Sequence, residues 1–334
     1  MRILYVNKYI NLSKPIIEEL IKMGFEVDVL IESLPHFDKS SLVHKISNIF
    51  YRLILNNKTY FIKKEKAIFE KFAEKRLKNK KYDIAFFIRA DTFSERLLKK
   101  VRKQSDKMVS YQWDGLERFP RIFDYYKYFD RKLVFDGNDI KKFYQYNLLP
   151  ISNFHYLEKS SQSSKKKELD LFYVGGGLAE RIKWAYNIEK YSKENNLKFK
   201  AILTIPEFHD ELKTDSVSLQ HRGISLDENR KYALITKSIL DFKMDSHDGA
   251  SLRIFDCLVQ EQKLITNNHT LRDYDFYHPD NIFITDFEDL TGLKEFLETP
   301  YHPIERKIVE KYGIKNWLKY ALDYGDYEPI NLPR

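Results

Sequence analysis

The sequence predicts an α/β protein of two domains, each built on a parallel sheet. Short apolar segments alternate with helical segments in both halves of the chain, which is typical of βαβ units. A polar stretch over 158–168, EKSSQSSKKKE, contains no apolar residue and separates the two halves as a linker. The length of 334 residues is enough for two domains of ordinary size.

These observations divide the chain into four parts. We expect a first domain over 1–157, the linker over 158–168, a second domain over 169–305, and C-terminal helices over 306–334 that can cross back to the first domain. Hydrophobic residues make up 43% of the chain and charged residues 32%, which indicates a globular protein. Cys257 is the single cysteine, so the sequence excludes a disulfide framework and a cysteine-rich metal site, and it suits a reducing compartment.

The first 32 residues predict a βαβ unit that begins a Rossmann-like half. RILYV is a buried strand, Pro15 to Met23 an amphipathic helix ended by Gly24, and EVDVLI a second strand. The turn after the first strand, NKYINLSKP, lacks glycine, so a dinucleotide-binding fingerprint is excluded. The sequence starts directly on a strand, without a secretory signal, and no apolar run reaches the roughly 18 residues of a membrane span. We therefore expect a cytoplasmic protein.

The segment 41–82 carries most of the positive charge. It holds twelve Lys or Arg against three Glu, while the formal charge of the whole chain is +8. Apolar residues are interspersed, and 62–78 is helical by period. A basic amphipathic stretch suggests contact with an anionic membrane surface; nucleic-acid binding competes, although RNA-binding motifs are absent. The plainer alternative is a helix that covers the sheet while its lysines stay in water.

Three strands of the first half each deliver an acid at the carboxyl end. They are 82–89 with Asp91, 107–113 with Asp114, and 132–135 with Asp136. Loop acids often only form turns or cap helices, and Asp136, in an Asp-Gly turn before a helix, fits that role. Asp114 follows an aromatic strand at an edge where ligands bind, so a general base or an acceptor ligand is nearly as good an interpretation.

The second half opens with a strand over 169–174 that runs into three glycines, Gly175 to Gly177, and then a helix from Leu178. Glycines let the backbone approach a ligand closely, and a strand, glycine loop and helix in this order predict an anion site. Arg181 lies in the first turns of the helix. The alternative is a permissive tight turn without a ligand.

A second βαβ unit, over 239–267, predicts the main ligand loop. Its first strand ends at Phe242, a polar loop covers 243–250, a helix runs from Ser251 to about Gln260, and a strand covers 263–266. Ser251 is a good N-cap, whereas Arg253 opposes the helix dipole in the first turn unless an anion binds there. The alternative is an exposed Arg253–Asp256 pair of little consequence.

Metal binding has only weak support. The histidines are scattered without metal-ligand spacing, although His247 lies in the ligand loop. Asp273 and Asp275 form a D-x-D pair that could hold Mg²⁺, but solvated loop acids are the favoured interpretation.

The second half resembles a known family of enzymes. Together with the two α/β halves, the stretch DSHDGASLRIFDCLVQEQKLITNN and the following RDYDFYHPDNIFI resemble GT-B glycosyltransferases of bacterial lipopolysaccharide, O-antigen and capsule assembly. Those proteins tend to show G-x-x-x-R-x-F-E-x-L-x-x-x-x-K-L-I-T-x-N and then Tyr-Asp-Phe-Tyr. The residues that hold the pattern are Gly249, Arg253, Phe255, Leu258, Lys263, Leu264, Ile265, Thr266 and Asn268. Asp256 stands where the family has glutamate.

The resemblance implies two Rossmann-like domains that face each other across a cleft. A nucleotide-sugar would bind in the second domain, and a saccharide acceptor, such as a lipid-linked one, in the first. The implied catalytic residues are Asp114 as base if the enzyme inverts, Arg253 on the leaving phosphate, and His247. The implied donor-binding residues are Gly175, Gly176, Gly177, Arg181, Lys243, Gly249, Ala250, Ser251, Leu252 and Asp256. Asp256 would hold the ribose or orient Arg253, and neither metal nor cofactor is expected.

Two alternatives stay open. A sugar-nucleotide epimerase has a similar fold and needs no membrane-facing basic segment. A binding protein without activity, for glycan or nucleic acid, would use the 41–82 segment instead.

Overall fold

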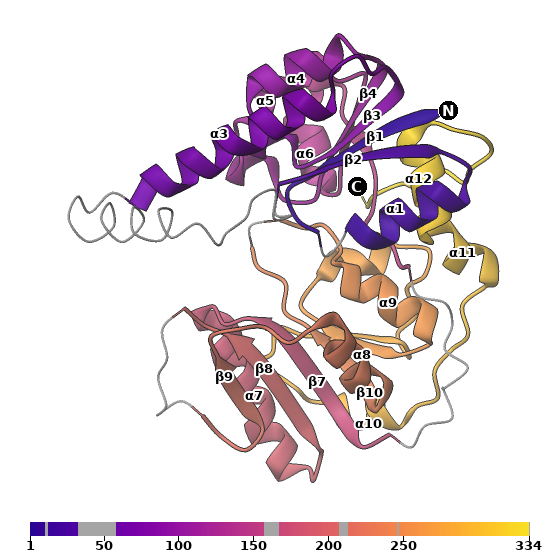
Figure 1. Cartoon of the computed structure of the whole chain (residues 1–334). Coiled ribbons are helices and arrows are strands. Elements are labelled where there is room, and N and C mark those ends of the chain that lie inside the picture. Colours follow the sequence, from indigo (N-terminus) through magenta and orange to yellow (C-terminus); the bar gives the residue numbers. More distant parts are fainter. Residues whose placement is uncertain (11–12, 33–57, 157–166, 207–212, 246, 334) are drawn as a thin grey trace. The chain divides into compact units, whose positions relative to one another are not determined.

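The computed structural model describes the chain except residues 11–12, 33–57, 157–166, 207–212, 246 and 334 (Figure 1). The chain forms two compact units. Unit 1 comprises Met1–Phe135, Asp139–Ile151 and Trp317–Glu328, and unit 2 comprises Asp136–Asn138, Ser152–Asn316 and Pro329–Arg334. Each unit contains one six-stranded parallel sheet, as the sequence predicts.

The sheet of unit 1 has the strand order β2-β1-β3-β4-β5-β6. Its strands are β1 (Arg2–Asn7), β2 (Glu26–Ile31), β3 (Tyr82–Ile88), β4 (Ser105–Gln112), β5 (Arg131–Val134) and β6 (Leu149–Pro150). The central strands β1 and β3 pair from Ile3 with Ile84 to Val6 with Phe87, and all of these side chains are buried. Burial on both faces explains why the strands read as continuous apolar runs rather than alternating ones.

Helices cover this sheet. They are α1 (Ser13–Lys22), α3 (Lys58–Arg76), α4 (Glu95–Arg102), α5 (Ile122–Tyr125), α6 (Gly137–Lys142) and α12 (Ile314–Leu322). Ala85 and Phe87 belong to the core cluster that α3, α4 and α5 complete. Phe86, which points to the opposite face because side chains alternate along a strand, contacts Trp317 of α12 at 5.9 Å between ring centroids.

The C-terminal helix therefore crosses back to unit 1. Basic side chains of β4 and β5 hold its last turn: Lys107 Nζ donates to the Leu322 carbonyl at 2.9 Å, and Arg131 donates to the Tyr320 and Ala321 carbonyls. Cations are favourable at this end of a helix because its carbonyl groups lack partners within the helix.

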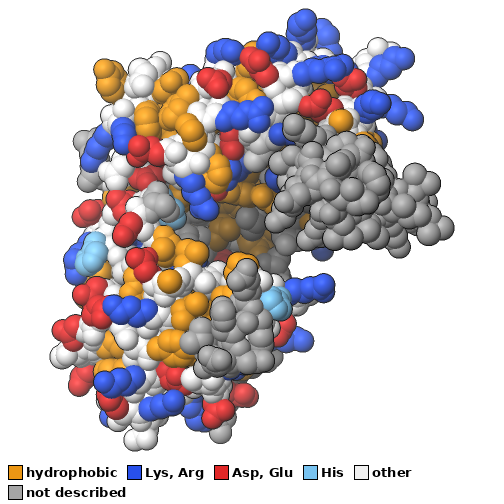
Figure 2. All heavy atoms as spheres, turned by 90° about the vertical axis from the view of Figure 1, so that its left-hand side faces the viewer, with side chains coloured by type: hydrophobic (Ala, Val, Ile, Leu, Met, Phe, Trp, Pro, Cys, Tyr) orange, Lys and Arg blue, Asp and Glu red, His pale blue; other side chains and the backbone are white. Residues whose placement is uncertain are grey.

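The described part of the basic segment behaves as a covering helix. Phe69, Ala73 and Leu77 lie buried in the core of unit 1, while Lys71 and Lys75 are exposed. In the space-filling view, Lys and Arg side chains with Asp and Glu between them cover the upper surface, where α3 and α4 lie in Figure 1 (Figure 2). Residues 41–57 of the segment lie outside the described residues.

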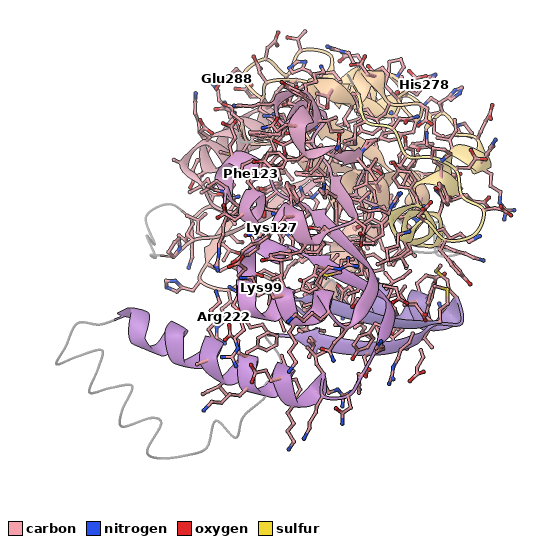
Figure 3. The ribbon with its side chains drawn as sticks, turned by 90° about the horizontal axis from the view of Figure 1, so that it is seen from above. Lys99, Phe123, Lys127, Arg222, His278 and Glu288 are labelled. Atoms are coloured by element: carbon pink, nitrogen blue, oxygen red, sulfur yellow. The ribbon has the colours of Figure 1, made fainter. Side chains whose placement is uncertain are left out.

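A serine hydroxyl caps the first turn of α4. Ser94 is the N-cap, and its hydroxyl accepts a hydrogen bond from the Leu97 amide. Glu95 next to it accepts from the Tyr128 hydroxyl at 2.6 Å and pairs with Lys127 and Lys99, which lie near each other in Figure 3. The hydrogen bonds from Tyr128 and Lys127 lower the pKa of Glu95 to about 2.

The sheet of unit 2 has the order β12-β11-β10-β7-β8-β9. Its strands are β7 (Leu169–Gly176), β8 (Phe199–Thr204), β9 (Val217–Gln220), β10 (Thr236–Asp241), β11 (Lys263–Thr266) and β12 (Ile282–Ile284). The chain runs outward from β7 through β8 to β9, and then returns to β10 on the other side of β7. The order thus reverses between β7 and β10, which is the Rossmann arrangement, and ligands bind outside the carboxyl ends of strands at such a switch point.

The helices of unit 2 are α7 (Ala179–Glu194), α8 (Leu226–Leu234), α9 (Leu252–Gln260), α10 (Leu293–Glu298) and α11 (Arg306–Lys311). The predicted strand 263–266 is confirmed. The strand before it, β10, ends at Asp241, one residue before the predicted end at Phe242. Short elements that carry little periodicity, such as α5 and β6, were not predicted. Within the described part of the chain, no helix combines the length and apolar character needed to cross a bilayer.

Candidate functional site

The candidate site of unit 2 is built around Asp241, the last residue of β10. Its side chain is buried at the switch point, and its Oδ1 accepts hydrogen bonds from Ser251 Oγ at 2.8 Å and Arg253 Nη1 at 2.7 Å. Thr266 Oγ1, at the end of β11, donates to Oδ2 at 3.3 Å. A buried carboxylate is costly unless it is paired in this way. Sequence reasoning missed Asp241, although an acid inside the apolar run SILDF was a signal.

Arg253 bridges the two strands of the switch point. Its Nη1 contacts Asp241 of β10, and its Nη2 donates to the Val174 carbonyl of β7 at 2.6 Å. The guanidinium also lies over the Tyr173 ring, 5.3 Å from the centroid. Burial by itself lowers the pKa of Arg253, but Asp241 offsets this and raises it. Arg253 is therefore a fixed cation.

This geometry corrects two interpretations of Arg253. The sequence argument held that an arginine in the first turn of a helix implies an arriving anion, but Asp241 already provides negative charge. Asp241, rather than Asp256, is the acid that orients the guanidinium. The side chain of Arg253 nevertheless keeps 27% of its surface exposed, so a ligand can still reach it.

Two helices start at this edge without a side-chain cap. Ser251 is the N-cap of α9 as predicted, but its hydroxyl donates to Asp241 and caps no amide. The N-cap of α7 is Leu178, which has no capping group and is half exposed at 51%. By contrast, Ser225 caps α8 through its hydroxyl. Helices α7 and α9 both start at the carboxyl ends of neighbouring strands, and their N-cap side chains bond none of their first N–H groups. These N–H groups favour an anion at this edge.

Glycine occurs at positions 175, 176 and 177 for different reasons. Strand β7 continues through Gly175 and Gly176, and none of the three adopts a positive φ, so the tight-turn alternative is wrong. A Cβ on Gly175 would lie 2.3 Å from the Tyr173 hydroxyl, and one on Gly177 would lie 2.4 Å from Ile205 Cγ2. These two glycines serve packing within the protein. At Gly176 the nearest atom is the Arg181 guanidinium at 3.7 Å, so only this glycine leaves space.

Arg181 completes the basic lining of the edge. Its Nε donates to the carbonyl of Phe242, directly after β10, at 3.1 Å. Phe242 in turn stacks on Tyr173, with ring centroids 4.0 Å apart. Arg181 and Arg253 thus hold the carboxyl ends of β7 and β10 from the two helix starts.

The loop after β10 is closed by its own charges. Lys243 Nζ donates to the His247 carbonyl at 3.0 Å and pairs with Asp248 at 2.9 Å, and only 11% of its side chain is exposed. Lys243 therefore holds the loop, and its geometry does not favour the expected role in lining the donor site. His247 lies in the same loop, half buried.

Asp248 is the centre of this loop, and sequence reasoning missed it. Its Oδ2 accepts from Asn138 Nδ2 at 2.6 Å, and its amide donates to Asp136 at 2.9 Å. Burial opposes its charge, but the hydrogen bond and charge of Lys243 lower its pKa overall. Gly249 and Ala250 follow, both buried, and Leu252 starts α9 half buried.

Asp256 is the unusual acid of α9. Its Oδ1 is buried and has no hydrogen-bond partner among the described residues. Burial raises the pKa of Asp256 to about 7, although the charges of Arg230 and Arg253 oppose the shift. A buried acceptor without a donor suits a ligand hydroxyl or an undescribed water.

Asp114, the candidate base, lies in unit 1. Its Oδ2 accepts a short hydrogen bond from Arg89 Nη1, and its Oδ1 lies 3.5 Å from Arg118 Nη1. Arg89 immediately follows β3 and was not singled out from the sequence. The expected turn role of Asp136 is confirmed, since its Oδ1 accepts from the Asn138 amide at 2.9 Å.

The D-x-D pair does not form a cation site in this arrangement. Asp275 accepts from the Tyr312 hydroxyl at 2.7 Å and pairs with Lys311 at 2.9 Å. In the described part of the chain, no group of three or more His, Cys, Asp or Glu could hold a metal ion. Independence from metal remains a prediction.

The structure brings together some predicted residues and separates others. Gly176, Arg181, Ser251 and Arg253 converge at the β7–β10 switch point of unit 2. Gly175 and Gly177 are close by but serve packing, and Lys243 is used within its loop. Asp114 belongs to the other unit.

No protein-family model and no curated protein matches the chain in sequence. Solved structures do match its fold. The catalytic domain of starch synthase IV from Arabidopsis thaliana, bound to ADP and acarbose, has a TM-score of 0.60 at 9% identity, with 97% of each chain covered. A glycosyltransferase from Rickettsia africae reaches 0.57 at 12% identity, covering 96% of this chain and 97% of its own. UDP-GlcNAc 2-epimerase from Methanocaldococcus jannaschii, in complex with UDP-GlcNAc and UDP, reaches 0.52 at 13%, covering 97% and 100%. The likeness shows that the chain has the GT-B type of fold, with two Rossmann-like sheets.

Proposed function

We propose that the chain is a glycosyltransferase that moves a sugar from a nucleotide-sugar to a growing cell-surface glycan, as in lipopolysaccharide, O-antigen or capsule assembly. One observation carries the proposal. Arg253 lies in the first turn of α9 and joins β7 to β10 at the switch point. Helix α9 has no side-chain cap, and neither has α7, the helix that follows β7. Backbone N–H groups and a guanidinium in one place form a site for a diphosphate.

On this proposal the donor diphosphate binds at the starts of α7 and α9, over Gly176. Arg253 and Arg181 then balance the negative charge that develops on the leaving phosphate. Asp241 holds Arg253 in place. Because the pair fixes one side of the guanidinium, the other side keeps a defined orientation toward the diphosphate. The reaction needs no metal when arginines and helix ends fulfil this role.

Further roles belong to the same proposal. Asp256 accepts a hydrogen bond from a donor hydroxyl, and His247 is a catalytic candidate from the loop. Asp114 of unit 1 takes the proton of the acceptor hydroxyl if the reaction inverts the anomeric centre, whereas a retaining reaction needs no such base. The acceptor is a saccharide carried on a lipid, and the basic segment 41–82 contacts the anionic cytoplasmic face of the membrane that holds it.

A sugar-nucleotide epimerase is the second candidate. The observation in its favour is the fold likeness to UDP-GlcNAc 2-epimerase over nearly the whole of both chains. An epimerase changes the sugar of a nucleotide-sugar without an acceptor, so the two activities differ in their products. Proton NMR of a nucleotide-sugar incubated with the protein would separate an epimer from a released nucleotide.

A thermal-shift screen against UDP-, GDP-, ADP-, dTDP- and CMP-sugars tests nucleotide-sugar binding. A ligand that binds only the folded protein stabilises it by about 2.7 kcal/mol at a hundred times its Kd. We expect at least one nucleotide class to raise the Tm of the wild type, and Arg253→Ala to lose that rise because the diphosphate loses its cation.

Arg272→Ala is the matched control, because Arg272 is an exposed arginine of the same unit whose guanidinium lies beside His269. It should respond like the wild type. If no nucleotide-sugar raises the Tm, or if Arg253→Ala responds fully, the proposed site is wrong.

A further inference from the structure

Unit 1 contains a second arrangement of buried charge at the carboxyl edge of its sheet. Arg89 directly follows β3 and adopts the left-handed conformation, with φ 54° and ψ 60°. A non-glycine residue in that region costs on the order of 1–3 kcal/mol and persists where the surroundings enforce it, often at functional sites. The residue is also buried, with 6% of its surface exposed.

One acid neutralises the buried arginine. Asp91 accepts two hydrogen bonds from Arg89, from Nε at 2.8 Å and from Nη2 at 2.9 Å, in the planar fork that guanidinium and carboxylate form. Gln112, the last residue of β4, donates to Asp91 Oδ1 at 2.8 Å. The ring of Phe119 lies 3.6 Å from the guanidinium carbon and packs its face. Burial opposes the charge on Arg89, but Asp91 and Asp114 raise its pKa.

The third nitrogen of the guanidinium, Nη1, contacts Asp114. Arg89 Nη1 bonds to Asp114 Oδ2, so a single oxygen of this carboxylate is fixed from the buried side. Among the described residues, the other oxygen, Oδ1, has only the longer contact of 3.5 Å with Arg118, whose side chain is 61% exposed. Asp114 itself is 22% exposed, against 6% for Asp91. The two acids therefore differ: Asp91 is saturated and buried, while Asp114 is held on one side and accessible on the other.

We infer that Arg89 is a positioning residue that fixes Oδ2 of Asp114 and presents Oδ1 to the acceptor hydroxyl. This inference rests on the proposed glycosyl transfer. In that reaction Oδ1 takes the hydroxyl proton as the acceptor oxygen bonds to the anomeric carbon of the donor. The bond from that carbon to the diphosphate oxygen breaks, and its electron pair leaves on the phosphate. The exposed guanidinium of Arg118 is displaced from Oδ1 when the hydroxyl binds.

The first test asks whether Arg89 holds Asp114 in solution, and it needs no substrate. The Nη signals of Arg89 are assigned in ¹⁵N NMR spectra of the full chain by their loss in Arg89→Gly. We expect Asp114→Asn to shift these signals, because a carboxylate acceptor becomes an amide, and to leave the Arg96 signals unchanged. Arg96 is a control on the surface of α4, where it pairs with Glu74. Arg89 signals that do not respond to Asp114→Asn overturn the inference.

The second test measures catalysis in a variant designed to fold. Arg89→Gly alone would leave Asp91 buried without a partner, so the double variant Arg89→Gly/Asp91→Asn removes both charges and the backbone strain together. We expect its Tm to equal or exceed that of the wild type. Its kcat for nucleotide release from the UDP-, GDP-, ADP- and dTDP-sugars, with octyl glucoside and octyl galactoside as acceptors, should fall about a hundredfold, as a misplaced catalytic group does. The donor KM should stay within about twofold of the wild-type value, since unit 2 holds the proposed donor site.

The outcomes separate this inference from the proposed function. An active wild type with a double variant of equal kcat overturns the role of Arg89 and leaves the proposed function standing. A rise in donor KM that accounts for the whole loss of kcat/KM also overturns it, because a positioning residue for the base acts on the chemical step. A wild type that releases no nucleotide from any of these donors overturns the proposed function, and the role of Arg89 with it.

Discussion

At the scale of single residues, the charged groups of this chain are defined by their partners rather than by their positions in a helix or strand. Arg253 in the first turn of α9 looks unfavourable until Asp241 is seen 2.7 Å away. Asp256, three residues further along the same helix, is the opposite case, because one of its oxygens is buried without a hydrogen-bond donor among the described residues. The first acid stabilises a fixed cation, and the second is left to be satisfied by a ligand or by a proton.

Asp256 should make the stability of the protein fall with rising pH. Its folded pKa is raised to about 7, whereas an unperturbed aspartate has a pKa of about 3.9. Between these values the folded state keeps a proton that the unfolded state has lost, so stability declines from about pH 4 to about pH 7 and then levels off. We expect Asp256→Asn to raise the Tm on the order of a few °C at pH 8, with a smaller gain at pH 5.

Differential scanning calorimetry across this pH range measures the effect. Asp273→Asn removes an exposed aspartate of the same unit and should change the Tm equally little at both pH values. An Asp256→Asn protein with the same pH dependence as the wild type would show that the carboxyl group is ionised throughout.

At the scale of elements, strand β7 shows how one motif can serve two purposes. The run Gly175 to Gly177 begins in β7 and ends one residue after it. Its outer two glycines are required by side chains packed against them, from Tyr173 of β7 and from Ile205 beyond β8. The middle one has only the Arg181 guanidinium near it, at the distance of an ordinary van der Waals contact. A run of identical residues is thus divided between packing and the candidate site.

Alanine substitutions should separate these purposes. Gly177→Ala should destabilise the fold by about 1–3 kcal/mol, because overpacking forces Ile205 or the backbone of Thr204 to move. Gly176→Ala should leave the Tm close to that of the wild type but weaken binding of the nucleotide-sugar found in the screen, since the methyl group enters the space beside Arg181. Calorimetry of unfolding and titration of the ligand measure the two effects. Equal loss of stability in both variants would contradict the assignment of Gly177 to packing and Gly176 to the candidate site.

At the scale of the whole molecule, charge is distributed unevenly. The segment 41–82 concentrates Lys and Arg. Helix α3 and the turn after it bury Phe69, Ala73 and Leu77 in unit 1, while Lys71, Lys75 and Lys78 are exposed. The apolar side chains over 69–77 are therefore used within the protein. The attraction to an anionic membrane that we propose then comes from exposed charge, which salt screens.

Charge reversal tests this attraction. The triple variant Lys71→Glu, Lys75→Glu and Lys78→Glu should reduce co-sedimentation with phosphatidylglycerol vesicles, because each basic residue near such a surface contributes about 1 kcal/mol. The matched control is the triple variant Lys190→Glu, Lys193→Glu and Lys198→Glu, which changes exposed lysines of unit 2 by the same charge. If both variants bind alike, the segment has no special role at the membrane.

The sequence by itself determined the longer elements and their order. Apolar period and cap residues are local properties. The strand that begins at Tyr82, the strand 263–266 and the helix after Ser251 could therefore be predicted without knowing the neighbours. The alternation of these elements was enough for the two parallel sheets. Arg181, Ser251 and Arg253 could also be placed at the carboxyl edge of the sheet, because helix starts that follow strands lie at this edge.

Only the tertiary structure decided what these residues contact. Strand order places β7 beside β10, and this brings the Val174 carbonyl to Arg253, 79 positions away in the chain. The same kind of long-range contact assigns Asp241 to Arg253, Lys243 to Asp248, and Arg89 to Asp114. The burial and the partners of a charged group depend on such contacts, which have no local signature. The sequence therefore indicated a candidate site but not which groups contact one another there.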